Sequence, residues 1–314
     1  MRSPVFCFTL LSTIAISIAA SLPVQAQRAR VFVASYGNDN NPCTFGSPCR
    51  TFQGAHDAVA AGGEITALDS AGFGVVNIDK SITITSPPGI EASIAAPAGA
   101  AAINILAGKN DVITIRGLTL NGAASANRGI DFSSGAKLAI IDCFITNYIQ
   151  YGIYLHTSST YTSVLISNTT VSEAAGGIVL STVDLGIDAT FRGLVLDNNT
   201  DSIELLGNGV PIHLMIADTQ IGTNSEIGIY SKGNPNYASD VNSIQLQNVT
   251  FTSMNYNIYL DGDTTVSLSH VTQLRSLSEG IGPYCAHSRN AVFSDGTNNL
   301  PVTDGCTIQV IAPK

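Results

Sequence analysis

Four side chains in the sequence are of types that can act on a sugar chain. A carboxylate can serve as acid, base or nucleophile in glycoside hydrolysis. An Arg or Lys can take the proton next to a uronate carboxyl group in a polysaccharide lyase. A histidine near the carboxylate and the arginine would complete a polar cluster. The candidate catalytic residues are therefore Arg128, Asp131, His156 and Glu204.

The spacing of the two carboxylates argues against these reactions. A hydrolase needs two carboxylates about 5 to 9.5 Å apart, and a calcium-dependent lyase needs clustered carboxylates as metal ligands. In the repeat described below, Asp131 and Glu204 fall three turns apart, or about 14 Å. Two polar clusters result, namely Arg128, Asp131, Tyr154 and His156, and then Glu204 with Lys232. We favour the interpretation that these clusters are solvated faces of strands over the interpretation that they are catalytic. We predict no metal site and no cofactor, with Ca²⁺ left open.

Five further residues, at or near the same outward strand positions, are candidates for ligand binding. Aromatic rings on an exposed face can stack on sugar rings, but Tyr also favours strand surfaces for structural reasons. Both interpretations stay open. The candidate ligand-binding residues are Tyr154, Tyr230, Lys232, Tyr259 and Asp261.

These residues are positioned by a repeat of about 25 residues. Each unit has two short alternating strands joined by a two-residue break, followed by a third strand that starts on a Gly-Ile pattern. The second residue of the break is of a type that tolerates a left-handed backbone in six of seven units: Gly117, Asp142, Asn168, Gly193, Asp218, Asn248 and His270. The isoleucines that begin the third strand form a second column: Ile130, Ile153, Ile178, Ile203, Ile229 and Ile258.

Two independent columns with one period predict a solenoid. The apolar spacing does not fit leucine-rich repeats, and the six-residue subperiod of a hexapeptide helix is missing. Three strands per turn, one tight bend and two longer loops predict an all-β, right-handed parallel β-helix. Its turns would stack about 4.8 Å apart, so that each inward column becomes a ladder of like residues. The strands between residues 87 and 102 cannot be assigned from this pattern.

The ends of the chain are predicted to differ from the repeat. Residues 1–26 have the charged start, apolar stretch and small-residue cleavage site of a signal peptide, with cleavage near Ala26. Residues 27–62 would hold a disulfide loop and a capping helix over residues 51–61. Residues 63–281 would form the β-helix and residues 282–314 a C-terminal cap. We expect the mature protein to be secreted or periplasmic, with no membrane span.

The cysteines agree with export to an oxidising compartment. Local pairing predicts disulfides between Cys43 and Cys49 and between Cys285 and Cys306. Cys143 is left alone at an inward position, where a buried, unreactive thiol is expected.

Composition limits the partners. The 314 residues are 45% hydrophobic and 12% charged, and the formal net charge is −9. A negative chain without a basic face disfavours nucleic acid and anionic lipid. It also disfavours acidic polysaccharides unless a cation bridges the two. The sequence says nothing about the oligomeric state.

A motif near the start of the mature chain resembles secreted β-helix proteins of the pectate lyase-like superfamily. It comprises residues 33–43 (VASYGNDNNPC), 48–52 (PCRTF), Ala55, 62–65 (GGEI) and 80–84 (KSITI). The resemblance implies a groove along the strand that begins with the Gly-Ile column, where enzymes of the superfamily bind polysaccharide. The superfamily also includes adhesins and phage spikes. We therefore predict a protein that binds extracellular or cell-envelope polysaccharide, or alternatively a lyase or hydrolase with an atypical site.

Overall fold

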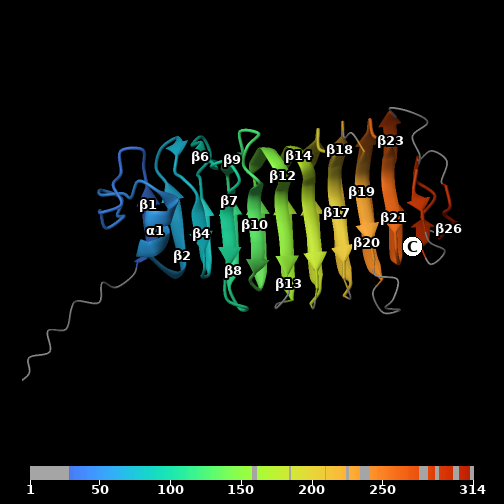
Figure 1. Cartoon of the computed structure of the whole chain (residues 1–314), viewed down its shortest axis with the longest axis horizontal. Coiled ribbons are helices and arrows are strands. Elements are labelled where there is room, and N and C mark those ends of the chain that lie inside the picture. Colours follow the sequence, from blue (N-terminus) through green and yellow to red (C-terminus); the bar gives the residue numbers. More distant parts are fainter. Residues whose placement is uncertain are drawn as a thin grey trace, which may run out of the picture.

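The structure is a computed structural model of the chain. It describes residues 28–157, 161–183, 185–208, 210–223, 226–233, 241–275, 282–286, 290–299 and 304–311. The predicted signal peptide, residues 1–26, lies outside the described residues. The described part is a parallel β-solenoid of about 8 turns with about 25 residues per turn. Figure 1 shows the strands stacked side by side along the long axis, in the order of the sequence.

The solenoid has three faces, each a ladder of parallel strands. Face 1 begins each turn, and β1 (Arg28–Val33) starts its ladder by pairing with β2. It continues through β2 (Val59–Ala67), β5 (Ile82–Thr85), β8 (Val112–Arg116), β11 (Lys137–Ile141), β13 (Thr162–Ser167), β15 (Ile187–Arg192), the first parts of β18 (Ile212–Gly222) and β20 (Asn242–Thr252), β22 (Thr264–Ser269), β25 (Ala291–Ser294) and β26 (Ile308–Val310).

Face 2 follows the tight bend. It consists of β3 (Ala71–Gly72), β6 (Ala92–Ala95), β9 (Leu118–Asn121), the first parts of β12 (Phe144–Thr157) and β14 (Thr170–Thr182), β16 (Val195–Asp197), the last parts of β18 and β20, and β23 (Thr272–Arg275).

Face 3 closes each turn. It consists of β4 (Val76–Ile78), β7 (Ala101–Leu106), β10 (Arg128–Ser134), the last parts of β12 and β14, β17 (Asp201–Gly207), β19 (Ile227–Lys232), β21 (Tyr256–Asp261) and β24 (Tyr284–Cys285). The stretch that the sequence pattern could not assign supplies β6 and the start of β7.

The predicted isoleucine column is the inner wall of face 3. Ile130, Ile153, Ile178, Ile203, Ile229 and Ile258 pair in register from strand to strand, and all six have 0% exposed surface. Fully burying an Ile side chain stabilises the folded state by about 1.5–3 kcal/mol. Because this ladder fixes the register of face 3, it also fixes which side chains lie next to one another on the outside.

The predicted bend between faces 1 and 2 is present in every unit. All seven residues of that column have a left-handed backbone, with φ between 49° and 71°. At Gly117, an added Cβ would also lie 2.6 Å from the carbonyl oxygen of Ser86. The residue types in the bend column are therefore explained by the backbone conformation that the bend requires.

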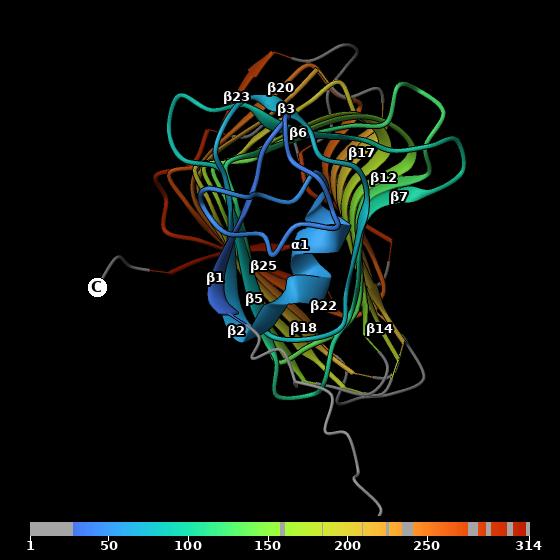
Figure 2. The same ribbon diagram turned by 90° about the vertical axis from the view of Figure 1, so that its left-hand side faces the viewer.

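The N-terminal end is covered as predicted, although the helix is shorter than expected. Helix α1 (Phe52–Ala58) lies across the open end of the solenoid in Figure 2, and Thr51 caps it by accepting a hydrogen bond from the Gly54 N–H at 3.0 Å. The prediction of a helix through residue 61 was wrong. Val59 is fully buried and pairs with Arg28 at the start of β2, so pairing with β1 ends the helix.

Both predicted disulfides are present, Cys43–Cys49 and Cys285–Cys306. Cys143 is free and buried, and burial raises the pKa of its thiol to about 11. Within the segment predicted as a C-terminal cap, strands continue to stack, since β24 pairs with β21, β25 with β22 and β26 with β25. No helix among the described residues is long and apolar enough to span a membrane.

Candidate functional site

The candidate site residues lie in three rows that run along the outside of face 3, parallel to the long axis. Row 1 lies two residues before the isoleucine column and contains Arg128, Tyr151, Gly176, Asp201, Ile227 and Tyr256. Row 2 follows the column directly and contains Asn104, Asp131, Tyr154, Val179, Glu204, Tyr230, Tyr259 and Tyr284. Row 3 contains His156, Ser181, Leu206, Lys232 and Asp261. We call the surface that these rows form the groove face.

The predicted polar cluster on β10 and β12 is assembled around Asp131. One carboxylate oxygen accepts a hydrogen bond from Arg128 Nη1 at 2.5 Å, and the other lies 2.7 Å from His156 Nε2. Burial alone would raise the pKa of Asp131, but the hydrogen bonds and charges of His156 and Arg128 outweigh it, so the pKa is lowered. Asp131 is therefore ionised at neutral pH, and its charge is directed at its own partners.

The contacts of His156 exclude a serine-nucleophile arrangement in this geometry. Ser133 Oγ lies 3.1 Å from His156 Nε2, the same nitrogen that contacts Asp131. In a catalytic triad the nucleophile and the carboxylate contact different ring nitrogens, so that the imidazole can take a proton on one and be held by the other. Here the hydroxyl and the carboxylate share one nitrogen.

An aromatic stack covers this cluster. The rings of Tyr151 and Tyr154 stack at 4.8 Å between centroids, and Tyr154 stacks on His156 at 4.6 Å. The Arg128 guanidinium lies 4.7 Å from the ring centroid of Tyr154, within range of a cation–π interaction. Tyr154 is thus held on both sides.

No ion pair joins Glu204 to Lys232 among the described residues. Lys232 is in row 3, opposite Leu206 and Asp261, whereas Glu204 is in row 2. The Glu204 side chain extends back toward the preceding turn. A Cβ added to Gly176 would lie 2.7 Å from Glu204 Oε1 and 2.8 Å from Tyr151. The missing side chain at Gly176 therefore makes room for the Glu204 carboxyl beside Tyr151.

Glu204 and Asp201 form an acidic pair that sequence reasoning missed. Burial, followed by the charge of Asp201, raises the pKa of Glu204 to about 7. Burial, followed by the charge of Glu226, raises the pKa of Asp201 to about 6, even though the N–H of Ile227 opposes the shift. The position two residues before each isoleucine of the column would have identified Asp201, together with Tyr151 and Tyr256.

A second group of aromatic side chains lies toward the C-terminal end. Tyr230, Tyr259 and Tyr284 follow one another in row 2, with ring centroids 5.8 and 4.8 Å apart. Tyr256 of row 1 meets Tyr259 edge-on at 5.3 Å. The hydroxyl of Tyr230 donates a hydrogen bond to Asp261 at 3.2 Å. We call these four tyrosines the C-terminal tyrosine group, of which the sequence predicted only Tyr230 and Tyr259.

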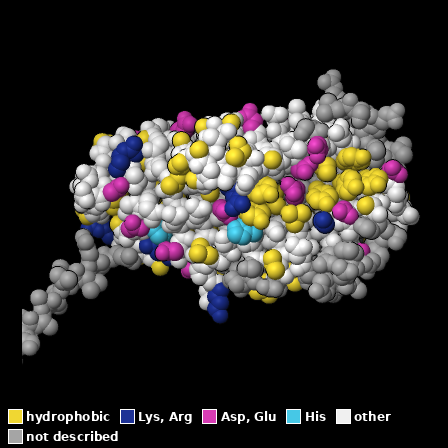
Figure 3. Space-filling model, viewed as in Figure 1, with side chains coloured by type: hydrophobic (Ala, Val, Ile, Leu, Met, Phe, Trp, Pro, Cys, Tyr) yellow, Lys and Arg dark blue, Asp and Glu magenta, His cyan; other side chains and the backbone are white. Residues whose placement is uncertain are grey.

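The space-filling view shows how these groups are distributed. Hydrophobic side chains, which include tyrosine in this colouring, form a continuous yellow patch in Figure 3. The patch covers the part of the surface where Figure 1 labels β19 and β21. Acidic side chains lie at the edge of this patch. Nearer the middle, basic and histidine side chains lie beside smaller hydrophobic areas. The groove face therefore has a mixed polar part followed by an aromatic part.

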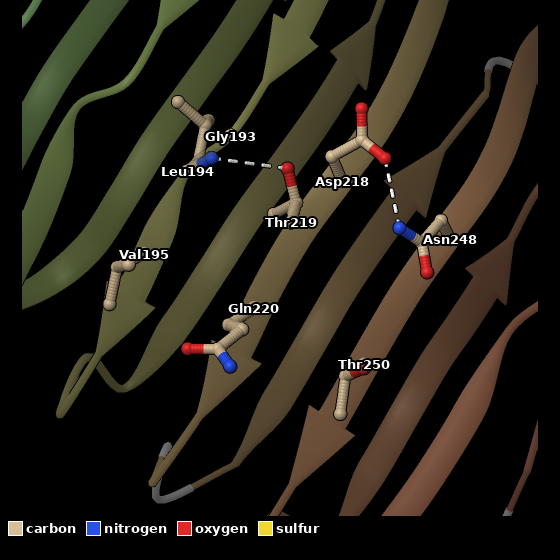
Figure 4. Close-up of a pocket in the computed structure, with 8 residues that line it drawn as sticks. All are labelled: Gly193, Leu194, Val195, Asp218, Thr219, Gln220, Asn248 and Thr250. Carbon is tan, nitrogen blue, oxygen red and sulfur yellow. Dashed lines mark hydrogen bonds between the residues drawn. The ribbon is translucent and has the colours of Figure 1, made fainter.

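Three hollows of the surface lie on faces 1 and 2. One of about 310 Å³ lies beside the tight bends and on face 2, where Leu194 N–H donates to Thr219 Oγ1 at 3.3 Å and Asn248 Nδ2 donates to Asp218 at 2.9 Å (Figure 4). Two smaller ones, of about 270 and 230 Å³, include side chains of face 1. None of these three is lined by the candidate residues.

Known structures agree with this architecture. No protein-family model and no curated protein matches the sequence. Among solved structures, pectate lyase Pel9A is 13% identical, with 92% of this chain and 79% of that chain covered at a TM-score of 0.60. The chain has the pectate lyase-like fold. XylC in complex with xylose shares this parallel β-helix at 9% identity, 84% and 68% coverage and a TM-score of 0.60. Identities this low establish the fold alone.

The predicted site residues are therefore divided into three places. Arg128, Asp131, Tyr154 and His156 are in mutual contact. Glu204 lies with Asp201, and Tyr230, Tyr259 and Asp261 lie together farther along the groove face. Among the described residues, no group of three or more His, Cys, Asp or Glu side chains could hold a metal ion.

Proposed function

We propose that this protein binds a polysaccharide along the groove face, by stacking sugar rings on tyrosines and by hydrogen bonds to the polar side chains between them. The observation that carries the proposal is the presence of six tyrosines on one face in two adjacent rows, Tyr151, Tyr154, Tyr230, Tyr256, Tyr259 and Tyr284. Tyr combines a large apolar ring with a hydroxyl that can form hydrogen bonds, a combination suited to sugars.

The ring contacts support a binding role. A sugar ring placed on a tyrosine needs a ring that keeps its orientation. Tyr151 stacks on Tyr154, which in turn stacks on His156, and Tyr259 contacts the three other members of the C-terminal tyrosine group. Such rings lose little conformational entropy when a ligand arrives, which favours binding. The names of two fold neighbours also mention carbohydrates, pectate for Pel9A and xylose for XylC, which fits a carbohydrate ligand.

We also propose that the ligand is extracellular or part of the cell envelope. The N-terminal residues have the pattern of a signal peptide, and the two disulfides fit an oxidising compartment. Amino-terminal sequencing of the protein recovered from its native host should give a first residue close to position 27. Recovery of an intact Met1 from the cytoplasm would contradict export.

Binding can be tested with residues 27–314 on a panel of plant, algal and bacterial polysaccharides. We expect at least one glycan to bind and Tyr259→Ala to weaken that binding about fivefold or more, the loss of a stacking contact of about 1 kcal/mol. Tyr36→Ala is the matched control, because Tyr36 is 69% exposed in a loop before α1 and lies off the groove face. Equal loss in both variants, or no binding at all, would contradict the proposal.

One observation favours catalysis as a second candidate function. Glu204, with a pKa of about 7, is a carboxyl that retains its proton near neutral pH, the property that a general acid needs. Asp201 provides a second carboxyl on the same strand, and Tyr151 lies beside Glu204. The enzyme hypothesis predicts new reducing ends or unsaturated ends from a bound glycan, and their loss in Glu204→Gln. Intact glycan after prolonged incubation, with and without Ca²⁺, would exclude it.

A further inference from the structure

The charges on the groove face are unequally distributed. The three rows carry two cationic side chains, Arg128 and Lys232, and four carboxyl side chains, Asp131, Asp201, Glu204 and Asp261. The Arg128 guanidinium is engaged by the Asp131 carboxylate at 2.5 Å. A ligand that reaches this part of the groove face therefore meets a neutralised ion pair, not a free positive charge.

The middle of the groove face is acidic. Asp201 and Glu204 lie on one strand, and Glu226 lies close enough to Asp201 to raise its pKa. Burial is the larger cause of the raised pKa values of Asp201 and Glu204, and the charge of a neighbouring carboxylate, Glu226 for Asp201 and Asp201 for Glu204, adds to each. A uronate carboxylate placed here would meet the same repulsion, because like charges across an interface lower affinity.

The aromatic side chains lie on both sides of this acidic part. The stack of Tyr151 and Tyr154 precedes it, and the C-terminal tyrosine group follows it. In row 2, five rungs separate Tyr154 from Tyr284, a distance of about 24 Å at the usual strand spacing. One residue of an extended glycan spans about the same length as one rung. The groove face between the two aromatic groups therefore matches about five or six sugar units.

We propose that the groove face selects a neutral, extended polysaccharide over a polyuronate and contacts about five or six of its sugar units, with both ends on tyrosines and the middle on Asp201 and Glu204. This inference rests on the proposed function, since it names the class of glycan bound by the same surface. Carboxyl groups in the middle can accept hydrogen bonds from sugar hydroxyls and, when protonated, donate them. Neutral sugars supply both kinds of partner without adding charge.

The first experiment compares affinities for neutral and acidic glycans. Residues 27–314 are tested by affinity electrophoresis and calorimetry against xylan, mannan and mixed-linkage glucan, and against polygalacturonate and alginate, at pH 8 and in 0.15 M salt, with and without Ca²⁺. We expect a neutral glycan to bind at least tenfold more tightly than either polyuronate. Equal or tighter polyuronate binding, with or without Ca²⁺, overturns the inference and leaves the proposed function standing. Binding of no glycan overturns the proposed function itself.

The second experiment locates the selectivity. The double variant Asp201→Asn, Glu204→Gln removes the acidic charge while keeping side chains of nearly the same shape. It should bind polyuronate at least fivefold more tightly at pH 8 than the unmodified protein does. Glu91→Gln is the control, because it removes an exposed carboxylate that precedes β6 of face 2. Unchanged polyuronate affinity in the double variant, or an equal gain in the control, overturns the assignment of selectivity to this pair.

The third experiment measures the length of the site. Oligosaccharides of the best neutral glycan, from two to eight units, should show affinity that rises up to five or six units and then stays constant. A plateau at two or three units would overturn the extended site. Tyr154→Ala should shorten the plateau length without abolishing the binding of short oligosaccharides to the C-terminal tyrosine group, and an unchanged plateau would contradict the placement.

Discussion

The tight bend between faces 1 and 2 and the groove face are built from the same turns, yet they use sequence in opposite ways. In the bend, every unit repeats one backbone conformation, and Gly, Asn or Asp occupies six of the seven positions. In row 2 of the groove face, successive turns present Asp, Tyr, Val, Glu and Tyr in one register. The backbone requires nothing of those outward side chains, so their variety is free to serve a ligand.

The difference extends to the contacts within each region. Asn168 Nδ2 donates to Asp142 at 3.3 Å and Asn248 Nδ2 donates to Asp218 at 2.9 Å, all on the exposed surface of the bend. Exposed polar contacts of this kind add little to stability. On the groove face, by contrast, Asp131 has only 16% of its side chain exposed and holds two partners. The residue types at the bend are therefore set by the backbone conformation, whereas the arrangement of the groove face is set by contacts between side chains.

The largest expected effect is at the bend. Gly117→Val should lower the free energy of unfolding by about 3 kcal/mol, since it places a branched side chain at a φ of 71° and against the Ser86 carbonyl. Urea denaturation measures the loss. Asn168→Gly is the matched control, because its φ of 49° suits glycine, and it should change stability little. Equal stabilities for Gly117→Val and the unmodified protein would show that the column is not a backbone requirement.

A smaller loss is expected where the groove face is tied together. Asp131→Asn should lower stability by about 1–2 kcal/mol at pH 7, because it leaves the Arg128 and His156 contacts without their anion. The folded-state pKa of Asp131 is lowered, so its stabilisation is complete above the ordinary carboxyl pKa and is lost as the pH falls through the lowered value. The two proteins should therefore converge in urea denaturation as the medium is acidified. Asp218→Asn, whose partner Arg192 is 3.8 Å away and exposed, is the control.

An effect on binding with little effect on folding is expected from the aromatic stack. Tyr154→Ala should reduce glycan affinity about five- to tenfold, because the Tyr151 ring loses the side chain that holds it in place and the glycan loses the Tyr154 hydroxyl, together about 1 kcal/mol. Isothermal titration and thermal unfolding measured together separate the two consequences. A variant that loses stability but keeps full affinity would place Tyr154 with the bend residues, as a structural side chain.

The smallest effect concerns Glu204 and has a definite sign. Its folded-state pKa of about 7 lies above the ordinary value of 4.5, so the folded protein holds a proton that the unfolded chain releases between these values. Stability is therefore greatest below the ordinary pKa and falls as the pH rises toward 7. Glu204→Gln should remove the Glu204 part of this slope, leave the part from Asp201, and raise stability at pH 8 by about 1 kcal/mol after solvent screening is allowed for. An unchanged slope in thermal unfolding between pH 4 and pH 8 would contradict it.

The sequence predicted those features that the backbone imposes. The isoleucine ladder and the bend column were visible because each turn must repeat them to stack. The helix was predicted three residues too long because pairing of Val59 with β1 is a tertiary contact, which has no local signal. The position of the Glu204 carboxyl had no local signal for a similar reason. Its side chain turns back into the space left by Gly176, and an absent side chain has no pattern of its own.

Each turn pairs only with the turns next to it, and this affects how the length of such a protein can change. A duplicated stretch of one period, inserted between two existing turns, finds the same inward ladder and the same bend on either side. It would lengthen the groove face by one rung without altering the ends or the disulfides. The reach of the binding surface can thus vary in whole steps through duplication, separately from the chemistry at any single rung. Natural variants or designed ones with an added turn after β14 would extend the stretch between the two aromatic groups by one sugar unit.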